Sequence, residues 1–174
     1  MMPELILLCG QKEYVCTAIT ASMYQRYAEI MERNDSDSLQ DAFEANTRIL
    51  MDVFGARQRE IEQAEPEEVL TAVKEIHFMM QDVITPKFLE LDPGHQTQIQ
   101  KEKSAFDEYD EENGYNEESS TESIWKICKE NVDRVVKICI RLMKNSYQQC
   151  MESDIIRLLE HAAFEIQTVD EDRR

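Results

Sequence analysis

Alternating and helical patterns of apolar residues divide the chain into a short hairpin and a series of helices. Leu5–Cys9 and Glu13–Thr17 are short, apolar-rich segments, and the Gly10, Gln11 and Lys12 between them are typical of a hairpin turn. The next apolar stripe has helical spacing and runs from Met23 to Met31, after Thr20 or Ser22 as its N-cap. These patterns predict an N-terminal β-hairpin followed by a helix.

Two further helices are predicted from their ends as much as from their apolar stripes. Ser38, three residues before Asp41, is a suitable N-cap, and Gly55 fits the position just after a helix. Pro66 fits the first position of the next helix, with glutamates in its first turn, and we expect Pro86 to end that helix. The N-terminal part is therefore predicted to pack its hairpin with about three helices.

The C-terminal part continues this helical pattern. Apolar residues from Ile124 to Met143 recur at helical spacing, and lysines and arginines occupy most of the polar positions between them. Asn145 and Ser146 interrupt the pattern, and a last helix is predicted from Ser153 to about Gln167. We predict a mainly α fold, with a small N-terminal β-hairpin, an acidic flexible linker and a C-terminal helical hairpin.

The net charge excludes several kinds of partner. The 174 residues include 36 acidic and 19 basic side chains, which gives a formal charge of −17. Nucleic acids and anionic membranes bind basic surfaces, so we expect neither as a direct partner. No apolar run has the roughly 18 residues of a membrane span, and no basic region precedes Leu5–Leu8, so we expect no signal peptide. Five cysteines without close pairing indicate a reducing compartment.

The charge is unevenly distributed, and its distribution predicts the domain organisation. Residues 1–91 carry −9, residues 92–121 carry −7, and residues 122–174 carry −1. Residues 107–118 contain seven acids and no base, with too few aliphatic side chains to form a core. We therefore predict an N-terminal module at 1–91, an acidic flexible linker at 92–121 and a C-terminal helical module at 122–174.

Motifs of catalysis and metal binding are missing from the sequence. The histidines show no HExxH spacing, no cysteine pair forms CxxC, and no GxSxG elbow is present. An EF-hand aligned on Gly114 would place Tyr109 and Ser120 at positions that require carboxylates. With four glycines in the chain there is no phosphate-binding loop. We expect no catalytic residue, metal or cofactor, and a binding protein rather than an enzyme.

Two segments resemble a known protein family. The hairpin start, the helix at 42–55 and the segment 61–76 resemble the tail assembly chaperones of long, flexible-tailed bacteriophages and prophages of Gram-positive hosts. Residues 124–155 are similar to the C-terminal extension of the longer product in such systems. Together the resemblance covers about residues 4–90 and 122–168. Its motifs are patterns of helices and caps rather than signatures of a reaction.

The resemblance implies a function and two partners. Such proteins hold the long, apolar tape measure protein in solution through the N-terminal module. Their extension recruits tail tube subunits, which polymerise around the tape measure protein and displace the chaperone. The resemblance therefore implies action in the host cell cytoplasm and absence from the mature virion. A frameshift junction, where one is used, would fall around residues 100–107. The sequence leaves self-association open.

The candidate partner-binding residues follow from the apolar stripes and from the resemblance. Residues that form core or client groove, two roles the sequence does not separate, are Phe43, Ile49, Leu50, Phe54, Val73, Ile76 and Met80. A surface for tube subunits is assigned to Trp125, Arg134, Arg141, Lys144 and Tyr147, with core packing as the alternative for the aromatic side chains. The alternative function from another class is an acidic DNA mimic that inhibits a DNA-binding protein, because of the charge of −17.

Overall fold

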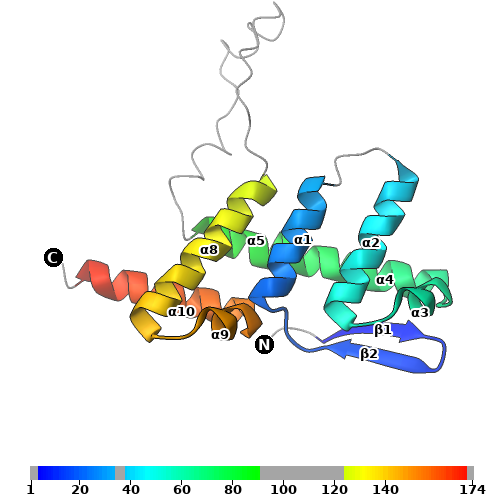
Figure 1. Ribbon diagram of the computed structural model, residues 1–174, viewed down its shortest axis with the longest axis horizontal. Coiled ribbons are helices and arrows are strands. Elements are labelled where there is room, and N and C mark those ends of the chain that lie inside the picture. The colour runs from blue at the N-terminus through cyan, green and yellow to red at the C-terminus, as the bar shows by residue number, and fades with distance from the viewer. Residues whose placement is uncertain (1–3, 34–37, 91–123, 172–174) are drawn as a thin grey trace, which may run out of the picture.

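Helices form most of the computed structural model, which describes residues 4–33, 38–90 and 124–171 (Figure 1). A two-stranded antiparallel hairpin precedes the helices. The predicted fold class, mainly α with a small N-terminal hairpin, is confirmed. The predicted acidic linker at 92–121 lies outside the described residues.

The hairpin consists of β1 (Leu5–Cys9) and β2 (Lys12–Cys16), in a register that pairs Leu5 with Cys16. Gly10, in the turn between the strands, has a φ of 64°, a left-handed conformation that glycine adopts without steric cost. β2 begins one residue earlier than the sequence predicted. Alternate side chains of β1 are buried, so one face of the hairpin belongs to the core and the other faces outward.

The predicted helix ends are confirmed for α2 (Leu39–Phe54), which follows α1 (Ala21–Arg33). The hydroxyl of Ser38 accepts a hydrogen bond from the backbone N–H of Asp41. Gly55 has a φ of 65° and donates its N–H to the carbonyl of Met51 at 2.9 Å. Both ends of α2 are thus capped as its sequence indicated.

The expectation that Pro86 ends the third predicted helix is wrong. After α3 (Gln58–Glu62), the helix α4 (Pro66–His77) has Pro66 in its first turn and continues through a π-helical stretch, η1 (Phe78–Ile84), into α5 (Thr85–Glu90). The Thr85 N–H donates to the Met80 carbonyl five residues before it, and the Thr85 hydroxyl donates to the same oxygen at 2.7 Å. Pro86 therefore lies in the first turn of α5, where the change from π-helical to α-helical bonding accommodates a residue without an N–H.

The C-terminal part contains one helix more than the predicted hairpin. α8 (Ile124–Met143) and α10 (Ile155–Glu171) match the two predicted helices, and the short α9 (Tyr147–Glu152) lies between them. Ser146 and Gln149 form a capping box at the start of α9, with side-chain bonds of 3.2 Å and 2.8 Å to backbone N–H groups. This reciprocal cap starts a helix in the segment 147–152, for which the sequence predicted no element between the interruption at Asn145 and Ser146 and the last predicted helix.

The helices form two layers. In Figure 1, α8, α1 and α2 lie side by side, and α4, η1 and α5 run across behind them. α1 contacts both α8 and α2, while α4 contacts β1 and α2. The hairpin lies at the end of the molecule that holds α2, α3 and α4 (Figure 1).

The N-terminal and C-terminal parts share one hydrophobic core. Buried residues of the hairpin, α1, α2 and α4 form a single cluster with buried residues of α8, α9 and α10. Backbone bonds also join the two parts, since the Ile155 N–H donates to the Ile19 carbonyl at 2.9 Å and the Ala21 N–H donates to the Ser153 carbonyl at 3.2 Å. The two predicted modules therefore pack against each other, and their boundaries stay a prediction.

Candidate partner-binding site

An apolar groove lies between α2, α3 and α4. Its volume is about 390 Å³. The residues that line it are Phe43, Asn46, Thr47, Leu50, Ile61, Glu62, Ala64, Pro66, Val69, Leu70 and Val73. Leu50, Ile61 and Val73 are buried, whereas the side chains of Phe43 and Leu70 are each 53% exposed. Two large apolar side chains at the mouth of a groove with an apolar floor are typical of a surface that binds an apolar segment.

The predicted groove residues divide into two sets. Phe43, Leu50 and Val73 line the groove, with Phe43 at its mouth. Ile49, Ile76 and Met80 are buried in the core, and Phe54 is half-buried against it. The predicted residues thus include part of the groove and part of the core beneath it.

Leu70 is the large exposed apolar residue of the groove lining that the site prediction missed. It belongs to the apolar stripe of its helix, but it lies one residue beyond Val69, the first of a row continued by Val73 and Ile76. Leu70 is three residues before Val73 but directly follows Val69, so it lies at the edge of that face, on the side nearer to solvent. A large apolar residue next to a row of buried positions was the one feature of the sequence that could have indicated an exposed groove residue.

Glu60 fixes α3, which forms one end of the groove. Its carboxylate accepts a hydrogen bond from Lys12 at 2.8 Å, from the Tyr14 hydroxyl at 2.6 Å and from the Arg57 N–H at 2.9 Å. These bonds lower the pKa of Glu60 to about 2; the bond from Lys12 has the largest effect, and the bond from Tyr14 the next largest. The hairpin is thereby attached to α3, and Ile61 and Glu62 next to Glu60 are held at the groove.

A polar network supports the groove wall at Asn46. Gln81 donates to the Tyr27 hydroxyl oxygen at 2.7 Å, and the Tyr27 O–H lies 2.6 Å from His77 Nδ1. Burial raises the pKa of Tyr27 to about 12, so the phenol keeps its proton and donates a hydrogen bond to Nδ1. The His77 proton then belongs on Nε2, which donates to Asn46 Oδ1 at 3.2 Å. The network requires a neutral His77.

Protonation of His77 is expected to destabilise the fold. Burial lowers the pKa of His77 below its ordinary value of 6.5. The unfolded chain therefore binds this proton more readily, and the stability is full above pH 6.5 and falls as the pH decreases through the lowered pKa. Urea unfolding at pH 7.5 and 5.5 should show a smaller pH dependence for His77→Gln than for the natural chain. His161→Gln, at an exposed histidine, is the control. Equal pH dependence in the natural chain and His77→Gln would contradict the assigned proton.

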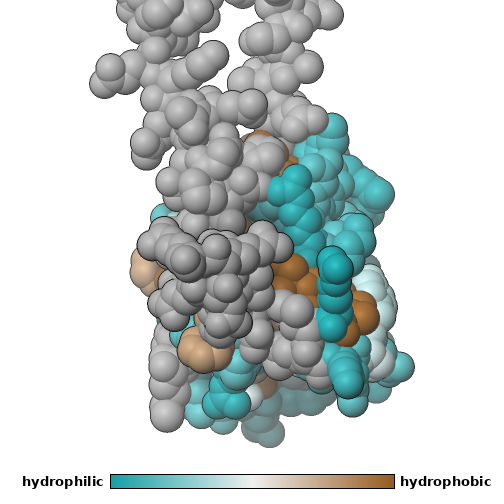
Figure 2. All heavy atoms as spheres, turned by 90° about the vertical axis from the view of Figure 1, so that its left-hand side faces the viewer, coloured by the Kyte–Doolittle hydropathy of each residue, from teal (hydrophilic) through white to brown (hydrophobic). Residues whose placement is uncertain are grey.

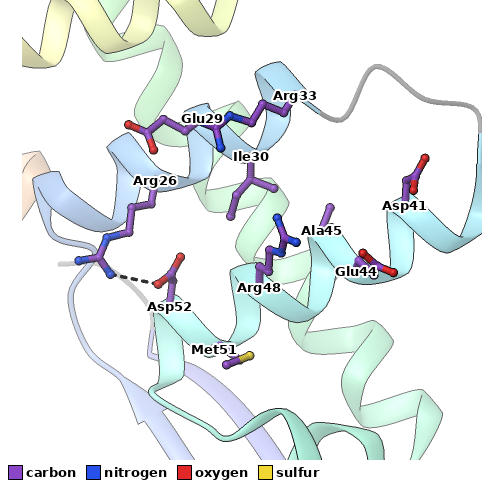
Figure 3. Close-up of a pocket in the computed structure, with 10 residues that line it drawn as sticks. All are labelled: Arg26, Glu29, Ile30, Arg33, Asp41, Glu44, Ala45, Arg48, Met51 and Asp52. Carbon is purple, nitrogen blue, oxygen red and sulfur yellow. Dashed lines mark hydrogen bonds and ion pairs between the residues drawn. The ribbon is translucent and has the colours of Figure 1, made fainter.

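A second hollow, of about 520 Å³, lies between α1 and α2 (Figure 3). Seven of the ten residues drawn there are charged, and Arg26 forms an ion pair with Asp52 at 3.0 Å across the two helices. Figure 3 shows Ile30 pointing from α1 toward α2, and Arg48 pointing from α2 toward α1. Because acids and arginines alternate around the hollow, it favours neither an anion nor an apolar segment.

The five predicted residues of the C-terminal part do not form a single cluster. Trp125, near the start, is half-buried, and its ring meets Tyr27 edge to face with centroids 5.5 Å apart. Arg134, Arg141, Lys144 and Tyr147 are exposed, from the middle of α8 to the start of α9. Sixteen residues of helix separate Trp125 from Arg141, about 24 Å at 1.5 Å per residue. Trp125 therefore lies in the contact between α8 and α1, apart from the exposed residues.

The remaining chemistry of the described residues is limited. Cys9 is half-buried and the other four cysteines are buried, all as free thiols. In the ranges that the structure describes, no group of three His, Cys, Asp or Glu side chains is placed to hold a metal ion. None of the helices described between residues 4 and 171 combines the length and apolar character that a membrane crossing requires.

Comparisons with known proteins do not assign a family. No protein-family model, no curated protein and no solved structure matches the chain.

Proposed function

We propose that the chain is a non-enzymatic tail assembly chaperone of a long-tailed bacteriophage or prophage. In this proposal it holds the tape measure protein in solution and recruits tail tube subunits in the host cytoplasm, and it is absent from the finished virion. The groove between α2, α3 and α4, with Phe43 and Leu70 exposed at its mouth, is the observation that carries the proposal. A protein that keeps an apolar partner in solution needs such a surface.

The chemistry around the groove favours one kind of ligand. Glu62 lines it, and Glu65, Glu67 and Glu68 are exposed where α4 begins next to Pro66 of the groove lining. An apolar helix stripe would occupy the floor, and lysines or arginines beside that stripe would meet these carboxylates. We therefore expect the client segment of the tape measure protein to be an amphipathic helix with basic flanks. The charge of −17 keeps the resulting complexes apart by repulsion.

Co-expression with the tape measure protein tests this proposal. Phe43→Glu combined with Leu70→Glu should reduce the soluble tape measure protein recovered with the chain by about tenfold or more, because each carboxylate would lose its hydration in the groove. The control combines Leu39→Glu with Phe78→Glu. These side chains are exposed, do not line the groove, and add the same charge.

The outcomes are distinct. A natural chain that leaves the tape measure protein insoluble would overturn the function. A groove variant that works as well as the natural chain would overturn the site. Capture of a nuclease or repressor that salt releases would favour the DNA mimic instead.

A further inference from the structure

Three exposed cations lie along the second half of α8 and just after its end. Lys137, Arg141 and Lys144, here called the basic stripe, are spaced by four and three residues; Lys137 and Arg141 share one face of the helix, and Lys144 directly follows its last residue, Met143. All three are exposed, as is Tyr147 just beyond them. Figure 2, which views the molecule from the side on which α8 and α10 lie, shows hydrophilic residues over much of the described surface, with a hydrophobic patch among them. The stripe is thus a local concentration of positive charge in a chain of net charge −17.

The basic stripe lacks partners within the described ranges. Elsewhere Lys12 pairs with Glu60, Arg26 with Asp52 and Lys129 with Glu32. No ion pair or hydrogen bond of the described residues engages the side chain of Lys137, Arg141 or Lys144. Residues 134–144 contain four bases and no acid, so the second half of the helix supplies no carboxylate of its own.

The stability of the helix explains only some of the cations in the basic stripe. Cations in the last turn interact favourably with the helix dipole, which accounts for Arg141 and Lys144. Lys137 lies nearly two turns before the end, where the dipole has little effect, and cations four residues apart on a helix repel each other. Lys144 also has a φ of 57°, at a position after the helix where glycine or asparagine is favoured. The stability of the helix therefore accounts neither for Lys137 nor for a lysine with the left-handed backbone of Lys144.

We propose that the basic stripe, with Tyr147 at its end, is a docking surface for an acidic segment of a partner protein. Acidic residues on neighbouring turns of a partner helix have Cβ atoms about 5–6 Å apart, as Lys137 and Arg141 do on α8, so their carboxylates can meet these cations one to one. Tyr147, which is 55% exposed, offers an aromatic face next to the charges. In the proposed function the partner that binds here is a tail tube subunit. Only this identification of the partner rests on the proposed function.

Binding of a fluorescein-labelled, glutamate-rich synthetic peptide to the full chain, followed by anisotropy, tests the proposal. Lys137→Gln combined with Arg141→Gln should weaken binding about tenfold or more, and added salt should weaken binding to the natural chain. The control, Arg59→Gln combined with Arg157→Gln, removes the same charge from exposed positions on α3 and α10 and should bind like the natural chain. Lys144→Gly should also weaken binding while keeping the helix end intact.

Other occupants give different results. Equal binding by the stripe variant and its control would overturn the proposal, as would binding of a DNA duplex in place of the peptide. Binding that appears only after the acids of 107–118 are neutralised would make this chain the occupant, and self-association lost in the stripe variant would make it a second copy. Either result would overturn the proposal that a partner protein occupies the basic stripe. The groove variant should still bind the peptide, so failure of the groove and failure of the stripe are distinguishable.

Discussion

Replacing Tyr24 with alanine is expected to lower the free energy of unfolding by about 3–5 kcal/mol. Tyr24 is fully buried on α1, where its ring stacks on Phe88 of α5 with centroids 5.0 Å apart. Its hydroxyl lies 2.7 Å from the Thr85 hydroxyl, and the side chain also lies beside Cys128 of α8. One side chain thus joins both layers of the molecule. Because domains of this size have about 5–15 kcal/mol of stability, its removal should bring the chain close to unfolding.

Urea unfolding followed by circular dichroism measures this loss, and Tyr24→Phe is its matched control. Phenylalanine keeps the ring and removes only the hydroxyl. The Thr85 hydroxyl still donates to the Met80 carbonyl, so the control should lose only about 1 kcal/mol. A loss below about 1 kcal/mol for Tyr24→Ala would contradict the burial of this ring. Equal losses in both variants would assign the effect to the hydroxyl instead of the packing.

The sequence predicted those helices whose ends carry local signals. Ser38 and Gly55 delimit α2 because a cap and a left-handed glycine act on neighbouring backbone groups, whatever the rest of the chain does. Pro66 marks the start of α4 for the same reason. The apolar stripe of α8 is long enough that its period alone identifies a helix.

The elements that were missed depend on tertiary contacts or on short segments. α3 and α9 have five and six residues, too few for a recognisable period. α3 is held by hydrogen bonds that Glu60 accepts from Lys12 and Tyr14 of the hairpin, 48 and 46 residues away. The helix continues past Pro86 because a π-helical stretch precedes it, in which the Met80 carbonyl accepts two hydrogen bonds from Thr85. A sequence pattern does not show such a change of helix type.

The candidate site could be predicted only in part, because one apolar stripe serves two purposes. Phe43 and Ile49 belong to the same stripe of α2, yet Phe43 is 53% exposed and Ile49 is 1% exposed. Which side of the stripe stays open depends on where α3 and the first turns of α4 pack against it. The position of α3 depends on the hydrogen bonds that Glu60 accepts from Lys12 and Tyr14 of the hairpin. The sequence around Phe43 therefore cannot show which side of the stripe is exposed.

Replacing Val132 with aspartate is expected to destabilise the chain by about 3–5 kcal/mol and to detach α8 from α1. Val132 is 1% exposed on α8 and belongs to the core cluster shared by both parts of the chain. A carboxylate there would be buried without a partner, one of the few single changes with effects this large. Trp125 reports the result, because it is the chain's one tryptophan and its ring packs against Tyr27 of α1. Its emission should shift to longer wavelength in Val132→Asp as the ring becomes hydrated.

The matched control is Asp133→Asn, a change at the next, exposed residue of α8 that should alter stability by no more than about 0.5 kcal/mol. Because α8 shares the core of α1, urea should unfold the natural chain in a single transition, with Trp125 fluorescence and circular dichroism changing together. Unchanged emission and stability in Val132→Asp would contradict the packing of α8 on α1. Two separate transitions in the natural chain would mean that residues 1–91 and 122–174 unfold as independent modules, as their different charges first indicated.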